Sequence, residues 1–108
     1  MGSKLAEFND DNFEEEVVKS SVPVMVDFYA EWCGPCKMMV PALESVGQQM
    51  GDSVKVGKVN IETSSSLTSK YGVKNVPTVL VFKDGEVVGR KIGSQTEASL
   101  KKLLSGDE

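Results

Sequence analysis

The sequence predicts one α/β domain, spanning residues 1–108, in which a mixed β-sheet carries helices on both faces. A nearly unbroken apolar run at residues 22–30 is typical of a central parallel strand that is covered on both sides. Strand-like and helix-like segments follow one another in the order βαβαβαββα, which favours a layered architecture. A chain of 108 residues with no repeat or linker is long enough for one moderate core.

The first helix is expected to be capped by Asn9 and to run to about Lys19. Asn is a preferred capping residue because its side-chain oxygen accepts a backbone N–H of the first turn. Phe8 and Phe13 are spaced as a hydrophobic staple around this cap. The apolar strand at residues 22–30 then follows.

A second helix is expected to begin after Cys33, because apolar residues recur at spacings of three and four. Pro41 lies inside this segment and should kink the helix. The residues of the predicted buried stripe are Cys36, Met39, Leu43, Val46 and Met50.

The remainder of the chain predicts a strand at 54–61, a short helix at 64–71 and a closing hairpin. The hairpin signal is Asp84-Gly85, a dipeptide that favours a tight turn. Its two strands are expected at 76–82 and 86–92. A last helix is predicted at 95–105, with its inward face formed by Ala98, Leu100, Leu103 and Leu104.

The composition is that of an ordinary globular protein, with 40% apolar and 26% charged residues. A net charge of −4 gives no electrostatic attraction to nucleic acid. The amino terminus is too polar for a signal peptide, and no apolar run reaches membrane-spanning length. We therefore expect a cytoplasmic monomer without a nucleic-acid or membrane partner. Residues 1–3 could be a remnant of cloning and not part of the natural chain.

The segment Trp32-Cys33-Gly34-Pro35-Cys36 carries the clearest chemical signal. Cys33 is expected to be exposed where the helix begins, where unpaired N–H groups and the helix dipole stabilise a thiolate. Cys36 lies on the buried stripe and is expected to reach back toward Cys33. Pro35 suits the first turn, since its missing N–H would be unpaired there. One sulfur would attack a disulfide, and the other would break the resulting mixed disulfide.

Three other interpretations of the cysteines are less favourable. A zinc site needs about four ligands, usually Cys or His, and the chain has two Cys and no His. A structural disulfide here would close a very short loop, worth about 2 kcal/mol against about 3 for a loop of about fifteen residues. Two ordinary core cysteines would need neither the flanking Trp nor the intervening Gly-Pro. The pattern therefore favours redox chemistry.

Several motifs in register resemble the thioredoxin family. The Cys-Gly-Pro-Cys segment follows an apolar strand that ends at residues 26–31, and Lys37 comes directly after it. Val76-Pro77-Thr78 precedes the hairpin, and Lys91-Ile92-Gly93 follows it. The resemblance runs from about residue 5 to residue 104, in the family's order and spacing.

This resemblance implies the thioredoxin fold and the reduction of protein disulfides by a dithiol, without a bound cofactor. It implies recharging by a thioredoxin reductase that uses NADPH. Cys33 corresponds to the family's nucleophile, Cys36 to its resolving thiol, Asp27 to its buried carboxylate and Pro77 to its cis-proline. One departure is Tyr29, where many members carry a second Trp. The apolar patch that receives substrates corresponds to Trp32, Gly34, Pro35, Val76, Pro77 and Gly93.

Asp27 interrupts a strand that should be buried on both faces, where an ionised carboxylate is costly. It is expected to have a raised pKa and to accept the proton of Cys36, through water. The alternative is an edge position where the carboxylate meets solvent. Lys58, on the neighbouring strand pattern, could approach Asp27 as part of the catalytic site, or could be a solvated surface lysine.

Two other function classes remain open on the sequence. The first is a thioredoxin-like binding subunit that uses no redox chemistry, although intact cysteines argue against a purely structural role. The second is an oxidase or isomerase domain of the secretory pathway. Such domains usually carry His where Pro35 stands here.

Overall fold

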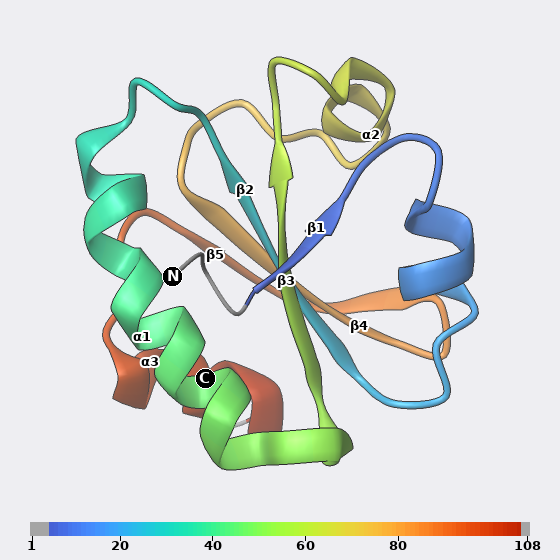
Figure 1. Cartoon of the computed structure of the whole chain (residues 1–108), viewed down its shortest axis with the longest axis vertical. Coiled ribbons are helices and arrows are strands. Elements are labelled where there is room, and N and C mark those ends of the chain that lie inside the picture. Colours follow the sequence, from blue (N-terminus) through green and yellow to red (C-terminus); the bar gives the residue numbers. More distant parts are fainter. Residues whose placement is uncertain (1–4, 107–108) are drawn as a thin grey trace.

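The computed structural model describes residues 5–106, which form one five-stranded sheet between two helical layers (Figure 1). The predicted remnant at residues 1–3 lies outside the described residues. The strands are β1 (Ala6–Phe8), β2 (Val24–Tyr29), β3 (Lys55–Asn60), β4 (Thr78–Lys83) and β5 (Glu86–Ile92). The helices are η1 (Glu14–Val18), α1 (Gly34–Met50), η2 (Gly51–Ser53), α2 (Ser65–Lys70) and α3 (Glu97–Ser105).

The sheet is mixed, with the strand order β1-β3-β2-β4-β5. Strands β1, β3 and β2 run parallel, whereas β4 is antiparallel to β2 and β5 is antiparallel to β4. The predicted order of elements is confirmed. Because β2 lies in the middle and has helices on both sides, all its residues from Val24 to Phe28 are buried.

The first helix is shorter than predicted. The side-chain oxygen of Asn9 accepts the backbone N–H groups of Asp11 and Asn12, at 2.8 and 3.0 Å, as a cap would, but the N-cap residue of the helical segment is Phe13. Residues 10–12 nevertheless form turns, and the helical segment η1 is a π-helical turn. The predicted staple is confirmed, since the rings of Phe8 and Phe13 meet edge to face at 6.2 Å.

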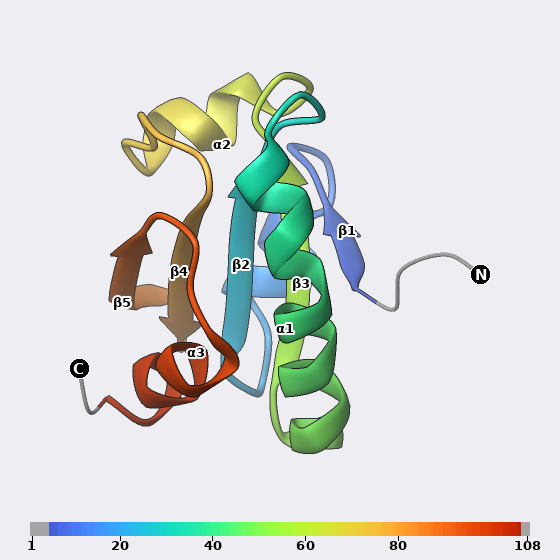
Figure 2. The same cartoon turned by 90° about the vertical axis from the view of Figure 1, so that its left-hand side faces the viewer.

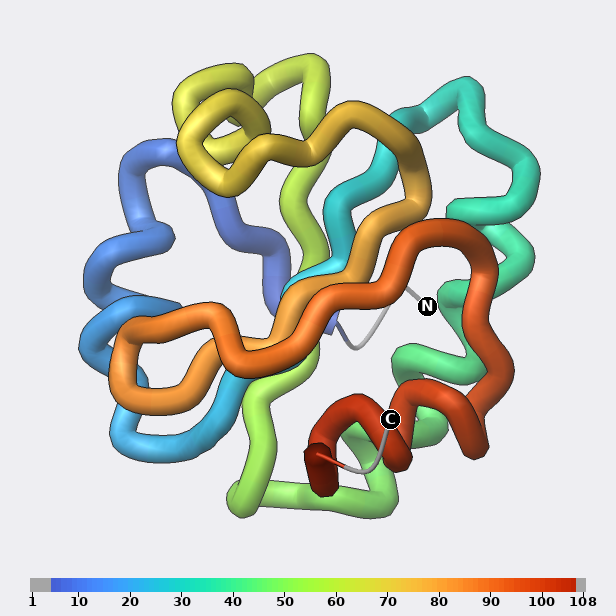
Figure 3. The backbone as a smooth tube through the Cα atoms, turned by 180° about the vertical axis from the view of Figure 1, so that it is seen from behind, coloured from blue at the N-terminus to red at the C-terminus, as the bar shows by residue number. Residues whose placement is uncertain are grey.

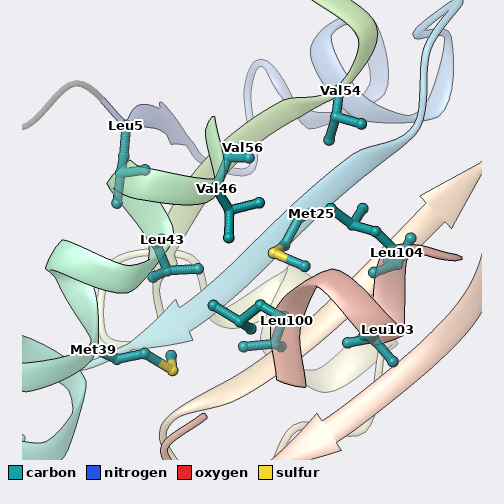
Figure 4. Close-up of a cluster of buried hydrophobic side chains, with 12 residues drawn as sticks. Leu5, Met25, Met39, Leu43, Val46, Val54, Val56, Leu100, Leu103 and Leu104 are labelled. Atoms are coloured by element: carbon teal, nitrogen blue, oxygen red, sulfur yellow. The ribbon is translucent and has the colours of Figure 1, made fainter. Parts of the chain in front are cut away.

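One face of the sheet is covered by α1 and α3, as Figure 2 shows. The buried stripe of α1 is confirmed except that Met50 is only partly buried. Ala98 is a correction, because it is exposed and not part of the inward face of α3. It lies two residues before Leu100, about 200° away around a helix. Figure 4 draws this aliphatic core, which contains Leu5, Met25, Met39, Leu43, Val46, Val54, Val56, Val79, Val81, Leu100, Leu103 and Leu104.

The other face is covered by η1 and α2, which lie on the opposite side of the sheet from α1 in the view of Figure 3. Its core is rich in aromatic rings. Phe82 packs edge to face against Phe13 at 5.4 Å and against Tyr71 at 5.2 Å. The buried residues of this aromatic core are Phe8, Phe13, Val17, Val24, Val26, Phe28, Val59, Leu67, Val73, Leu80 and Phe82.

The hairpin turn is as predicted. Asp84 and Gly85 have φ angles of 53° and 81°, the pair of left-handed residues that a type I′ turn requires. Pro41 lies inside α1, and the kink expected there stays a prediction.

Candidate functional site

The two cysteines lie at the amino terminus of α1 and form a disulfide with Cα atoms 5.3 Å apart. Cys33 is the N-cap residue, and its sulfur accepts the backbone N–H of Cys36 at 3.2 Å. Pro35 stands in the first turn, as predicted. The helix terminus therefore offers a hydrogen-bond donor and the positive end of a dipole to the Cys33 sulfur.

The predicted exposure of Cys33 is wrong in the oxidised state. Cys33 is only 3% exposed and Cys36 only 2%. Both pack with Ala30 in a small apolar cluster, against which Val76 lies. The residues around the first sulfur, Trp32, Gly34 and Pro35, are exposed instead. The burial of the two sulfur atoms does not distinguish the attacking thiol from the resolving thiol.

The predicted substrate patch comes together from three segments. Trp32 is 68% exposed and lines a hollow of about 320 Å³ with Val76. The Val76–Pro77 peptide bond is cis, as expected. The N–H of Gly93 donates to the carbonyl oxygen of Pro77 at 2.8 Å, which joins the third segment to the second.

Several residues of this surface were not predicted from the sequence. The indole N–H of Trp32 donates to Oε2 of Glu62 at 3.3 Å. Ile61 lines the hollow beside Trp32, and Ile92 is 59% exposed next to Gly93. Because the parallel strands β2 and β3 end at one edge of the sheet, Ile61 and Glu62 could have been expected near the cysteines.

Asp27 lies deep in the sheet behind the disulfide. It is 1% exposed, and its Oδ1 accepts no hydrogen bond from the rest of residues 5–106. Burial raises the pKa of Asp27 to about 7, and the charge of Lys58 opposes this rise in part. The expected raised pKa is confirmed, and the alternative of a solvated edge position is wrong.

Lys58 is the cross-strand neighbour of Asp27 in the register of β2 and β3. Its ammonium lies 4.0 Å from Oε1 of Glu7 and 5.0 Å from the centre of the Tyr29 ring. The hydroxyl of Tyr29 donates to Oε2 of Glu7 at 3.1 Å. Burial, and then the Glu7 carboxylate, raises the pKa of Tyr29 to about 12. Lys58 therefore neighbours Asp27 in the sheet, and a part for it in catalysis stays a prediction.

A cavity of about 80 Å³ joins Asp27 to the disulfide, because Asp27, Cys36 and Lys58 all line it. This volume exceeds the roughly 10–15 Å³ that one water needs. A larger hollow of about 420 Å³ between β1, β3 and α1 is lined by none of the predicted site residues.

Within residues 5–106, no group of three or more His, Cys, Asp or Glu side chains could hold a metal ion. In the same range, no helix combines the length and the apolar character that crossing a bilayer requires. The groups that the described residues bring together at the site are two sulfurs, a buried carboxyl and a nearby ammonium.

Comparison with known proteins gives a consistent result. The family model described as Thioredoxin matches residues 4–106. The chain is 43% identical over 102 residues to Thioredoxin 1 of Synechococcus elongatus, covering 94% of this chain and 95% of that protein. It is 47% identical over 91 residues to a thioredoxin of Rickettsia prowazekii, covering 84% and 87%. It is 46% identical over 96 residues to a thioredoxin of Rhodospirillum rubrum, covering 89% and 92%.

Proposed function

Since the chain belongs to the thioredoxin family and is a protein-disulfide reductase with a redox-active Cys33–Cys36 pair, we propose that Cys33 attacks and Cys36 resolves. The observation that carries this assignment is the position of Cys33 at the N-cap of α1. Its sulfur already accepts the Cys36 N–H in the disulfide. In the reduced protein, the same donor and the helix dipole favour a thiolate at Cys33.

The reaction transfers two electrons to the substrate disulfide through two successive thiol–disulfide exchanges. The Cys33 thiolate attacks one sulfur of a substrate disulfide; that bond breaks, and the second substrate sulfur leaves as a thiolate. Cys36 then loses its proton and attacks the Cys33 sulfur. The mixed disulfide breaks, the Cys33–Cys36 disulfide forms, and the substrate departs with both sulfurs reduced.

Asp27 accepts the Cys36 proton in this proposal, through water in the cavity between them. The cavity and the burial of Asp27 support this role. A carboxyl with a pKa of about 7 is well matched to proton transfer near neutral pH. Lys58 stabilises the ionised form of Asp27.

Substrates bind the apolar surface around the disulfide in this proposal. The exposed ring of Trp32 and the segment around Pro77 support it, because an extended peptide can pair with the backbone of Val76. Exposed apolar side chains around a reactive disulfide are typical of a surface that becomes buried when a partner protein binds. The surface comprises Trp32, Gly34, Pro35, Val76 and Gly93. Pro77 is buried and not part of the exposed surface, and it contributes through its cis bond to Val76.

The partners of the cycle follow from the family in general terms: disulfide-containing proteins, and a reductase that returns the dithiol state. We propose that this is a thioredoxin reductase drawing on NADPH, with no cofactor bound to this chain. We further propose that the chain works as a single-domain monomer in the cytoplasm. A reducing compartment suits a chain whose two cysteines both serve exchange.

Substituting the two cysteines separately tests the assigned roles. Cys33→Ser should abolish insulin reduction, because no attacking thiolate remains. Cys36→Ala should still attack and should accumulate as a mixed disulfide, because nothing resolves it. Non-reducing electrophoresis of each variant after mixing with insulin separates these results. Equal trapping by both variants would contradict the assignment.

A further inference from the structure

Three side chains of alternating charge form a row across the parallel strands. Glu7 on β1 is in register with Lys58 on β3, and Lys58 is in register with Asp27 on β2. Since β3 lies between β1 and β2, the one ammonium stands between two carboxyl groups. Residues in direct register project from the same face of a parallel sheet, here the face that α1 covers.

The contacts of Lys58 lie on the Glu7 side of this row. Its ammonium is 4.0 Å from Oε1 of Glu7 and sits over the ring of Tyr29 at 5.0 Å. The Tyr29 hydroxyl holds the other oxygen of Glu7 at 3.1 Å. Each contact is individually weak, because the ion pair is partly exposed. Together they place the ammonium beside Glu7 and Tyr29, and Oδ1 of Asp27 accepts no hydrogen bond from it.

We propose that Glu7 is a positioning residue that, with the Tyr29 ring, holds the Lys58 ammonium away from the Asp27 carboxyl and so delays the ionisation of Asp27 to higher pH. As Asp27 loses its proton, it attracts the ammonium inward and must compete with Glu7 for it. A cation that is already engaged stabilises the new carboxylate less than a free one.

The other charged groups near Asp27 do not take the place of Glu7 in competing for the Lys58 ammonium. Glu31 and Lys37, from the segment after β2 and from α1, line the same cavity with opposite charges. On the other side of β2, the neighbour of Asp27 in β4 is the apolar Val79. Cys36 faces the cavity and does not titrate while it is in the disulfide.

The consequence for turnover rests on the proposed function of Asp27 as proton acceptor. If Glu7 delays the ionisation of Asp27, it also raises the pH at which the resolving step reaches half its maximal rate. Glu7 touches neither sulfur nor substrate in this arrangement. Its effect would pass entirely through Lys58.

The test is a titration of Asp27 in the oxidised protein, followed by carbon NMR of its side-chain carboxyl. Glu7→Gln should move the midpoint down by about half a pH unit, equivalent to about threefold more ionised Asp27 at a fixed pH. The shift should be largely lost when Glu7→Gln is made in a Lys58→Met protein. Glu15→Gln is the matched control, since it removes the same charge from an exposed residue paired with Lys19 at 3.7 Å.

A midpoint in Glu7→Gln that equals the midpoint in Glu15→Gln would overturn the proposal. An equal shift with and without Lys58 would also overturn it, because Glu7 would then act on Asp27 directly. The rate of insulin reduction between about pH 5 and pH 9 separates this inference from the function it rests on. A titration that shifts while the rate profile stays fixed would support the role of Glu7 and refute the proton-acceptor role of Asp27.

Discussion

The two faces of the central strand β2 have opposite characters, although they are made by neighbouring residues. Phe28 points into an aromatic core under η1 and α2. Asp27, one residue earlier, points to the face covered by α1, where the core is aliphatic and the cysteines lie beside it. Because successive side chains of a strand alternate between faces, one apolar run serves both.

The difference between the two faces shows that the destabilising carboxyl of Asp27 is confined to the face that α1 covers. A buried carboxyl with a raised pKa destabilises the folded state wherever it is ionised. Among the buried side chains of residues 5–106, Asp27 is the one carboxyl, and it lies on the α1 face. Changes on the aromatic face are therefore expected to alter stability alone, and changes around Asp27 to alter both stability and chemistry.

The largest expected effect is that of Phe82→Ala on the aromatic face. Phe82 is 1% exposed and meets two other rings, so its loss leaves a cavity that the surrounding strands cannot fill. The free energy of unfolding should fall by about 3–5 kcal/mol. Urea unfolding at neutral pH measures this loss, with Phe82→Leu as the milder control.

Phe82→Ala should also leave the ionisation of Asp27, on the other face, unchanged. The midpoint of the Asp27 titration should remain near that of the parent protein, because Phe82 lies on the opposite side of the sheet. A midpoint that shifts in Phe82→Ala would mean that the two faces of the sheet are not independent.

The next effect is that of Asp27→Ala, and its sign depends on pH. The folded pKa of about 7 lies above the ordinary value of 3.8, so the folded state binds the extra proton between these values. Stability therefore falls as the pH rises through that window, and the full penalty applies above about pH 7. Removing the carboxyl should raise the free energy of unfolding at pH 8 by at most about 4 kcal/mol, and little at pH 4.

Urea midpoints of the oxidised parent and variant at the two pH values measure this effect. The cavity left by the carboxyl lowers stability equally at both, so the difference between pH 8 and pH 4 isolates the charge. Insulin reduction near neutral pH should slow at the same time, because Cys36 loses its proton acceptor. A variant destabilised at pH 8 would contradict the stability role of Asp27, and a variant with undiminished turnover would contradict its role as proton acceptor.

Much of this arrangement could be predicted from the sequence. The apolar run around Asp27, the helical spacing after Cys33 and the Asp84-Gly85 turn each carry a local signal of strand, helix or hairpin. The alternation of the elements then leaves few topologies open. The cysteine pair and its helix terminus were predictable for the same reason, since a short motif fixes them.

The features that were missed depend on which strands are neighbours. Glu7 and Tyr29 approach Lys58 only because β3 pairs with both β1 and β2, and no local pattern records that pairing. The burial of Cys33 was missed because it depends in part on Val76, which comes from a distant segment of the chain. Ala98 was misassigned because short helices tolerate an exposed Ala without any change in periodicity.

The smallest effects come from one substitution, Gly→Ala, made on each side of the sheet. In β3, a Cβ on Gly57 would lie 2.7 Å from the carbonyl oxygen of Ala6 and closer still to the Phe8 ring on the aromatic side. The edge strand β1 would have to move, so Gly57→Ala should lower the free energy of unfolding by about 1–3 kcal/mol.

In α1, a Cβ on Gly47 would meet Val56 at 3.5 Å, an ordinary contact. Gly47→Ala should therefore raise stability by about 0.5–1 kcal/mol, because Ala loses less backbone freedom in a helix. Urea unfolding of the two variants, measured side by side, gives the sign of each change in the free energy of unfolding. If both changes had the same sign, close packing against β1 would not be what distinguishes the two positions.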